Sequence, residues 1–558
     1  MLRAQAPPNF ALSYKRMKRG PKQTMLAGHK MVEDANLQGL SSTLGCLLAG
    51  APSDLTKTLA TSTLTHPKML MGRQQTIFHL RSQKLKTWNA RFTRIAAIEE
   101  DLAPFFQRDG KEKDSLEDDS IAQLSFQYEA LRPLNHIPWL LFAMSLFKIW
   151  LVPAMSILMP IVVWIMPYIL LRFVYALPIT QQQYMHIIQN IFNGNMIIPP
   201  MGAPEIAREP LSFKTIFQYS MFGFTFAQSM IQPIQNAMHL YKTDAVCIKL
   251  GRQILELRTF LQEFRADLAQ VNGIHVKLTF SLEHLDPNDI RMAFTSIQDT
   301  PENIHMVFRD LAHLETLWRI SESPLLHPVI FSKERFILTE CSDISLKVAT
   351  AIPSSIDLQD KTHAILTGPN GGGKSSFLRA VLQCVLLSHA FGFAPAKESY
   401  IPRFVWIASG LQLRDTPGQF SMFETEVKFA ADSLAVANMD GPGLVLFDEL
   451  FHSTNPRDSE RSAIQFLHRL WKKPQTFSIV STHLFPLVSA APPNVQALCC
   501  DAKQSENGEI EYSYGVQAGV CNVSSVHKVW EKFGLARYAA RSGSSRKVSE
   551  LHRTTNDV

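Results

Sequence analysis

A glycine-rich run from Gly368 to Ser375 carries residue types that bind phosphate. It reads Gly-Pro-Asn-Gly-Gly-Gly-Lys-Ser and matches the Walker A pattern. Glycines let backbone N–H groups approach phosphate oxygens, Lys374 brings a positive charge to the β- and γ-phosphates, and the Ser375 hydroxyl can ligate Mg²⁺. We therefore expect the phosphates of a nucleotide to be bound by Gly368, Pro369, Asn370, Gly371, Gly372, Gly373, Lys374, Ser375 and Ser376.

Two acidic residues follow an apolar run further along the chain. Residues 444–447 predict a buried strand that ends at Asp448 and Glu449, as in a Walker B motif. There the first acid holds Mg²⁺, and the second orients or deprotonates the attacking water. A further apolar strand, residues 477–481, leads to His483, at the strand end where parallel sheets bind ligands. We expect His483 to sense the γ-phosphate.

These motifs need a particular set of elements to bring them together. Residues 362–367 predict a strand before the glycine-rich loop, and residues 377–387 predict a helix after it. This order places a helix N-terminus against the phosphates. The predicted fold class is therefore an α/β P-loop NTPase domain at residues 324–540, preceded by an all-α core and lever domain.

The net charge and the cysteine content restrict the class of protein. The chain has a formal net charge of +6, which allows an anionic partner without requiring one. Its seven cysteines include no Cys-x-x-Cys pair, so we expect neither a disulfide framework nor a zinc site, and we infer a reducing compartment.

Residues 1–60 are predicted to be a basic, disordered N-terminal region. A nucleic-acid arm, an anionic-lipid anchor and a transit peptide remain alternatives for its basic stretch.

A hydrophobic block at residues 133–238 interrupts the predicted helical domain. The stretch from Ile149 to Leu171 has no charged residue and exceeds the roughly 20 residues that cross a bilayer core. A second uncharged stretch, Thr215–Met238, is also long enough, although its glutamines would need partners in lipid. We predict a multi-pass membrane protein, most simply with two spans. A re-entrant hairpin, or buried hairpins in a soluble domain, are the alternatives.

The regions on either side of this block read as two parts of one helical core, residues 61–132 and 239–323. A heptad seam on a long helix is formed by Leu250, Ile254, Leu257, Leu261, Phe264 and Leu268. Because both parts must pack together, we expect them on one side of the bilayer, with the ATPase on the cytosolic or other reducing side. The number of crossings is then even. Residues 541–558 are predicted to be a disordered tail.

Several motifs together resemble one family. The form Gly-Pro-Asn-x-Gly-Gly-Lys-Ser is that of the MutS mismatch-repair family, and residues 368–375 match it. Residues 421–427 resemble the family's Ser-x-Phe-x-x-Glu segment, residues 448–456 resemble its loop after Walker B, and Thr482-His483 resembles its switch histidine. Arg73 and Gln74 lie in a stretch that resembles the start of its helical core.

The resemblance implies an ATPase that uses ATP and Mg²⁺ and moves a helical lever. On this basis Glu449, His483 and Lys374 are candidate catalytic residues, and Ser375 and Asp448 are candidate metal ligands. In the family, the serine matching Ser421 reaches the γ-phosphate of a partner subunit, which implies a homodimer. An aromatic residue upstream stacks on adenine there, and Phe336 is the candidate in this sequence.

The sequence departs from the family in ways that limit these expectations. It shows neither a mismatch-reading domain nor the Phe-x-Glu wedge of that domain, so we expect at most DNA binding without mismatch selectivity. Phe451 and His452 stand where many relatives have Gly and Arg. An ABC-transporter-like ATPase is one alternative, although its Leu-Ser-Gly-Gly-Gln signature is missing. A non-catalytic nucleotide-binding scaffold is the other.

Overall fold

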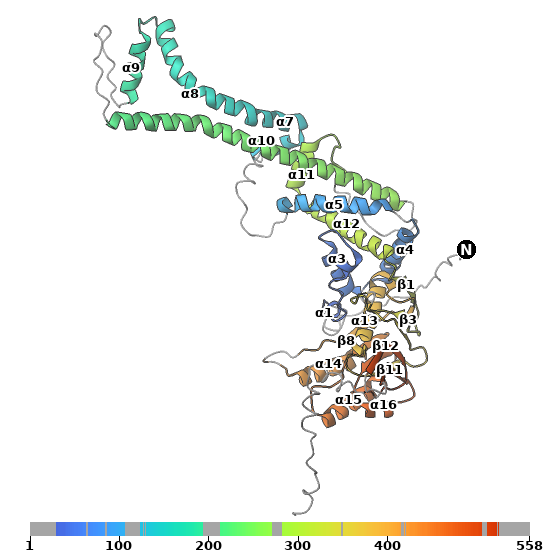
Figure 1. Ribbon diagram of the computed structural model, residues 1–558. Coiled ribbons are helices and arrows are strands. Elements are labelled where there is room, and N and C mark those ends of the chain that lie inside the picture. Colours follow the sequence, from blue (N-terminus) through green and yellow to red (C-terminus); the bar gives the residue numbers. More distant parts are fainter. Residues whose placement is uncertain are drawn as a thin grey trace, which may run out of the picture. The chain divides into compact units, whose positions relative to one another are not determined.

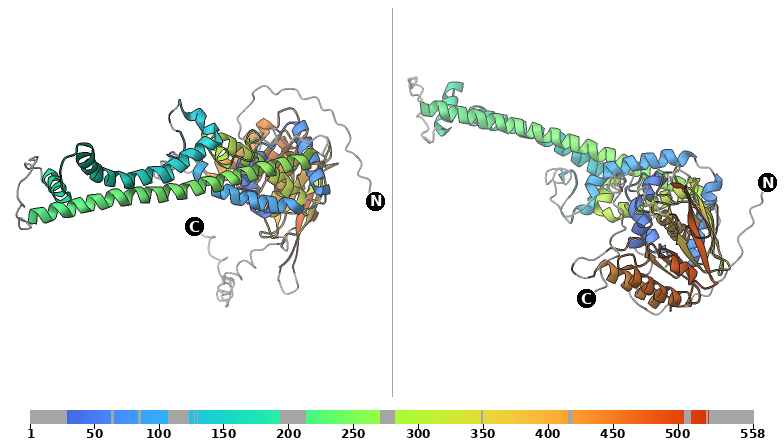
Figure 2. Two further views of the ribbon diagram at one scale, coloured as in Figure 1. Left: turned by 90° about the horizontal axis from the view of Figure 1, so that it is seen from above. Right: turned by 60° about the horizontal axis from the view of Figure 1, so that its bottom comes forward.

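The computed structural model describes most of the chain in two compact units. The described residues are 29–62, 65–83, 86–106, 123–126, 128, 130–192, 213–269, 282–347, 350–414, 418, 420–504, 510–521 and 523. The first unit contains the described parts of Met1–Thr93, Asp267–Leu278 and Phe308–Val558. The second contains those of Arg94–Ala266 and Thr279–Val307. Figures 1 and 2 show their secondary structure.

The first unit is built on a six-stranded sheet in the order β12-β11-β5-β10-β9-β8. Its strands are β5 (His363–Thr367), β8 (Trp406–Gly410), β9 (Gly443–Phe447), β10 (Thr476–Ser481), β11 (Val495–Gln504) and β12 (Ile510–Ala518). The first five run parallel, and β12 pairs with β11 antiparallel. The central strands are buried along their whole length, as expected for a sheet covered on both faces. The predicted α/β class is confirmed.

Helices and a smaller sheet complete the C-terminal part of this unit. The helices are α13 (Lys374–Phe391), α14 (Met422–Val436), α15 (Pro456–Leu470) and α16 (Phe485–Ser489). The smaller sheet has the order β2-β7-β3-β4, with β2 (Ile330–Phe331), β3 (Ile337–Cys341), β4 (Ser354–Asp357) and β7 (Glu398–Ile401). A two-stranded pair joins β1 (His327–Pro328) to β6 (Phe393–Ala394).

The prediction of a disordered region at residues 1–60 is wrong for residues 29–60. They form α1 (His29–Asp34), α2 (Leu40–Leu44) and α3 (Ala51–Ala60), and Val32, Leu55 and Leu59 are completely buried. The rest of the unit supplies their partners. The carboxylate of Glu315 accepts from the backbone N–H groups of Leu47 and Leu48 at 2.7 and 3.0 Å. Such short helices depend on tertiary packing, which local sequence does not reveal.

Three long helices support the sheet domain in this unit: α4 (Pro67–Gln83), the first part of α5 (Lys86–Phe106) and the main part of α12 (Pro301–Glu322). Trp88 and Phe92 of α5 pack on Trp318 of α12, with ring centroids 6.3 and 5.4 Å away. Arg81 of α4 donates to the carbonyls that end α12, including that of Ser321 at 2.9 Å. Its guanidinium thus satisfies carbonyls that the helix leaves unpaired.

The second unit contains the long helix that the sequence predicts. Helix α10 (Phe213–Ala269) is continuous, and the predicted heptad seam is confirmed because each of its residues in this unit is at most 3% exposed. Gly251 of α10 allows α11 (Ile290–Asp299) to pack closely, since a Cβ there would lie 2.1 Å from the Ile290 carbonyl oxygen. Asp244 of α10 pairs with Arg291 of α11 at 2.6 Å.

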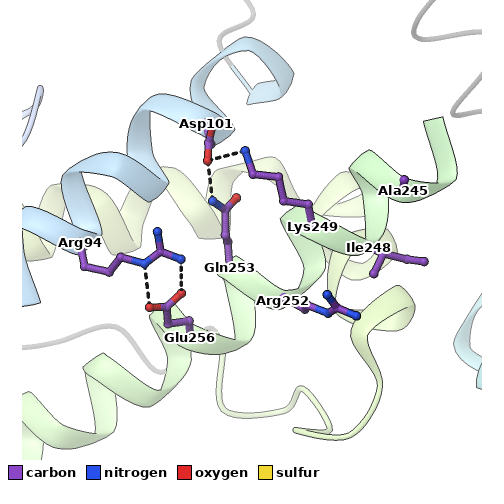
Figure 3. Close-up of a pocket in the computed structure, with 8 residues that line it drawn as sticks. All are labelled: Arg94, Asp101, Ala245, Ile248, Lys249, Arg252, Gln253 and Glu256. Carbon is purple, nitrogen blue, oxygen red and sulfur yellow. Dashed lines mark hydrogen bonds and ion pairs between the residues drawn. The ribbon is translucent and has the colours of Figure 1, made fainter. Parts of the chain in front are cut away.

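Polar side chains join the second part of α5 to α10, around a surface pocket of about 390 Å³ (Figure 3). Arg94 and Glu256 form two hydrogen bonds of 2.8 Å each. Asp101 accepts from Lys249 at 2.9 Å and from Gln253. These exposed pairs fix the register of the two helices more than they stabilise them, because exposed ion pairs contribute about 0–1 kcal/mol.

The first part of the hydrophobic block forms one long helical stretch in this unit. It runs through α7 (Pro138–Leu146), the π-helical segment η3 (Phe147–Leu151), α8 (Val152–Ile169) and the π-helical segment η4 (Leu170–Val174), and is followed by α9 (Gln181–Phe192). Of the described helices, one is long and apolar enough to cross a membrane, and its span is Pro138–Met159. It begins earlier than the predicted Ile149–Leu171. The second predicted span, Thr215–Met238, lies within α10 and does not meet this criterion, since its glutamines reduce its hydropathy.

Candidate nucleotide-binding site

The glycine-rich loop joins β5 to α13, as the sequence predicts. Gly371 and Gly373 have left-handed backbones, with φ of 76° and 102°, and Gly373 is the N-cap of α13. Gly368 has a φ of 145°, and a Cβ there would lie 3.1 Å from Cys500 of β11. These positions favour glycine because a side chain would strain the backbone or press on its neighbour. The loop therefore presents backbone N–H groups at the N-terminus of a long helix.

Lys374 lies inside this loop and is 5% exposed. Its Nζ atom donates to the carbonyl oxygens of Gly368 and Pro369 at 3.0 and 3.2 Å. Burial lowers the pKa of Lys374, while the nearby carboxylates of Glu449 and Asp448 oppose that shift. The amine is thus held by backbone oxygens and acidic neighbours in a partly desolvated position, where a charge acts strongly on a phosphate.

The two acidic residues follow β9 and are organised by a residue that the sequence reasoning missed. Ser481, at the end of β10, donates its hydroxyl proton to Asp448 Oδ1 and accepts from the Glu449 backbone N–H at 2.8 Å. Glu449 has a left-handed φ of 53°, which costs free energy in a residue with a side chain. The sequence feature that could have identified Ser481 as a site residue is its position at the carboxyl end of β10, the strand that pairs with β9.

His483 lies between the lysine and the second carboxylate. Its Nε2 atom is 3.3 Å from Lys374 Nζ and 3.6 Å from Glu449 Oε1. Nε2 can accept from Lys374 or, when protonated, donate to Glu449, but it cannot do both at once. Hydrogen bonding with His483 lowers the pKa of the Glu449 carboxyl, and burial opposes this shift. The structure therefore brings Lys374, Asp448, Glu449 and His483 together.

Two other predicted site residues have different surroundings. Ser421 is the N-cap of α14, and its side chain and backbone N–H form a capping box with Glu424. It is exposed at that helix end.

Phe336 is 0% exposed and packs edge-on against Phe404 and Phe477, with ring centroids 5.5 and 5.8 Å away. In this structure Phe336 is a core side chain, so no ring face is open for adenine.

The predicted metal ligands suit magnesium rather than a fully protein-bound metal. In the described part of the chain, no group of three or more His, Cys, Asp or Glu side chains could hold a metal ion. Mg²⁺ commonly takes one or two protein oxygens and fills its remaining positions with water and phosphate. Asp448, which is oriented by Ser481, and the exposed hydroxyl of Ser375 at the start of α13 fit that donor set.

Comparisons with known proteins agree with these motifs. Residues 364–545 match the family model of MutS domain V. The DNA mismatch repair protein MutS of Thermus thermophilus is 29% identical over 187 residues, covering 33% of this chain and 22% of that protein. Over 365 residues, the DNA mismatch repair protein msh-2 of Neurospora crassa is 24% identical, covering 57% of this chain and 38% of that protein. The mitochondrial DNA mismatch repair protein MSH1 of Arabidopsis thaliana is 30% identical over 190 residues, covering 33% of this chain and 16% of that protein.

The chain thus matches less than two fifths of the length of each of these relatives. The family model covers the ATPase-type α/β domain. The matched residues include the whole glycine-rich loop, Asp448, Glu449 and His483. Taken with the motifs, these matches show that the chain is similar to proteins of the MutS family over its ATPase-type domain.

Proposed function

We propose that this protein is a MutS-like ATPase that binds ATP with Mg²⁺ and hydrolyses it. The observation that carries the proposal is the convergence of Lys374, Asp448, Glu449 and His483 beside the glycine-rich loop. Mg²⁺, held by Ser375 and Asp448, would neutralise phosphate charge. The family supports the activity, since its members are ATPases.

Each side chain has a role that follows from its surroundings. The loop N–H groups and Lys374 bind the phosphates. Glu449, whose pKa is lowered, is a carboxylate at neutral pH, so it can orient a water and accept its proton. His483 contacts both Lys374 and Glu449 and can therefore respond to a γ-phosphate placed between them.

We further propose that nucleotide binding moves the helical core through the far end of α13. Arg73 of α4 donates to the Ala390 carbonyl at 3.0 Å, and Gln74 donates to the Gly392 carbonyl at 2.9 Å. These contacts fix α4 to the C-terminal end of the helix whose N-terminus holds the phosphate loop. A shift of α13 would therefore be passed to α4.

The proposal extends to partners. We propose a homodimer in which the exposed N-terminus of α14, with Ser421 as its cap, closes the site of the partner subunit. We also propose duplex DNA as a substrate, because the relatives are named as DNA mismatch repair proteins. We expect no mismatch selectivity, since residues 1–323 contain no Phe-x-Glu segment that could act as a wedge. A mismatched duplex that outcompetes a matched one tenfold would contradict this.

Association with a membrane is a separate proposal. The helix Pro138–Met159 carries large apolar side chains that are mostly exposed, including Trp139 at 69%, Phe142 at 59% and Trp150 at 65%. Exposed apolar surface of this extent favours burial in a lipid or protein environment. We propose that this helix is buried in a lipid bilayer and that the ATPase domain lies on the reducing side of the membrane.

Two variants test the ATPase directly. Lys374→Ala should lose ATP affinity, because it removes the positive charge inside the loop. Glu449→Gln should retain ATP and stop turnover, since the amide keeps the shape but cannot accept a proton. Binding of a fluorescent ATP analogue and phosphate release should be measured for both variants and the wild type. Equal phosphate release by wild type and Glu449→Gln would refute the assignment.

A further inference from the structure

The loop after Glu449 contains a histidine that contacts two acceptors. His452 Nδ1 lies 3.0 Å from the backbone carbonyl oxygen of Glu449 and 2.9 Å from Glu426 Oε1. Glu426 belongs to α14 and is 1% exposed, and its other oxygen accepts from the Ser453 hydroxyl at 2.5 Å. A buried carboxylate thus lies directly behind the loop that carries the proposed catalytic glutamate.

The neighbours of His452 decide which of its ring nitrogens carries the hydrogen. A carbonyl and a carboxylate can only accept, so Nδ1 must carry the hydrogen. Its hydrogen bond goes to the Glu449 carbonyl, and Glu426 Oε1, which has no hydrogen-bond donor in the structure, lies 2.9 Å from the same Nδ1 atom. Because a buried carboxylate oxygen without a donor is costly, Glu426 Oε1 favours an N–H group nearby. His452 Nδ1 lies within hydrogen-bond distance of this oxygen.

The backbone that His452 contacts is strained. Glu449 and Phe451 both have a φ of 53°, in the left-handed region that non-glycine residues rarely adopt. Phe451 is held by packing, since it is 2% exposed and its ring lies 6.2 Å from that of Phe423 on α14. The Glu449 carbonyl, which His452 contacts, is part of the backbone that joins these two strained positions. The loop therefore depends on α14 for its shape, through the contact between the Phe451 and Phe423 rings and through the polar contacts of His452 and Ser453 with Glu426.

We propose that His452 is a positioning residue for ATP hydrolysis, which holds the backbone of Glu449 and couples it to α14 through Glu426. The proposal rests on the proposed function. Because α14 begins at Ser421, the helix end that would reach a partner subunit is linked through Glu426 and His452 to the residue that would orient the water. Movement of α14 would thus change the geometry of Glu449 without touching the phosphate loop.

The test compares His452→Ala with His452→Asn, whose side-chain amide can place an N–H near the position of Nδ1. His468→Ala is the matched control, because His468 is an exposed histidine in the last turn of α15, away from the loop. We expect His452→Ala to lower kcat about tenfold, or about 1.4 kcal/mol in the barrier, and to change KM less than twofold. His452→Asn should recover most of kcat, and His468→Ala should match the wild type.

A second readout does not depend on turnover. Amide hydrogen exchange in residues 449–453 should accelerate in His452→Ala and return towards wild type in His452→Asn. An unchanged kcat in His452→Ala, or equal kcat and exchange in the Ala and Asn variants, would overturn the proposal. If the wild type itself releases no phosphate, the proposed ATPase function fails, and the exchange data then decide whether His452 holds the loop.

Discussion

Replacing Gly392 with alanine should weaken the junction between the phosphate-loop helix and the helical core. Gly392 is the C-cap of α13 and has a left-handed φ of 75°. A Cβ at this position would meet three atoms of Gln74, Cδ at 2.7 Å, Cγ at 2.8 Å and Cβ at 2.9 Å. Gln74 cannot simply move aside, because its amide donates to the Gly392 and Val329 carbonyls.

The expected loss of stability has two parts. A left-handed backbone costs alanine roughly 1–2 kcal/mol relative to glycine. Crowding of a packed contact costs roughly 1–3 kcal/mol more. We therefore expect Gly392→Ala to lower the free energy of unfolding by about 2–5 kcal/mol, the sum of these ranges.

Gly45 provides a matched control for the backbone part. It is the C-cap of α2 and has a φ of 72°, but a Cβ there would have no atom within 4 Å. Gly45→Ala should therefore show the backbone cost alone. In a Gln74→Ala background, Gly392→Ala should cost about 1 kcal/mol less than in the wild type, because two of the three crowding atoms are gone.

The assay is urea denaturation monitored by tryptophan fluorescence under identical conditions. It compares five proteins: the wild type, Gly392→Ala, Gly45→Ala, Gln74→Ala and the double variant of Gln74→Ala with Gly392→Ala. The result that would refute the reasoning is a Gly392→Ala loss no larger than that of Gly45→Ala. A Gln74→Ala background that leaves the cost unchanged would also count against the contact. Phosphate release by Gly392→Ala then reports whether the α4 junction matters for turnover.

Three other predictions concern the dimer, pH and the membrane. Ser421→Ala should reduce ATP turnover more than ATP affinity, measured by phosphate release and equilibrium binding; an equal effect on both would contradict a role at the partner's site. Burial lowers the pKa of His389 from 6.5 to about 4, so the unfolded chain binds a proton that the folded protein excludes. His389 alone should therefore lower stability between pH 6.5 and 4 by roughly 3 kcal/mol; His389→Gln should make this pH slope less steep in denaturation curves, and an unchanged slope would refute it. The protein should stay with membranes after alkaline extraction, and tags at residue 60 and the C-terminus should lie on one side of sealed vesicles; recovery in the soluble fraction would exclude the span Pro138–Met159.

Local sequence was sufficient where chemistry or periodicity is written into neighbouring residues. The glycine-rich loop had to lie between a strand and a helix, because its glycines and Lys374 work only at a helix N-terminus. The heptad seam of α10 was likewise readable, since repeated apolar residues such as Ile254 and Leu257 define one helix face. These features depend on spacing along the chain, and the structure agrees with them.

The tertiary structure decided everything that depends on contacts between distant residues. It buried Phe336 among aromatic side chains, folded residues 29–60 against Glu315 and the rest of the first unit, and set Ser481 beside Asp448. It also brought Glu426 to His452. Local sequence could not specify these pairings, because each depends on which strands and helices become neighbours, and that is settled by packing of the whole domain rather than by local preference.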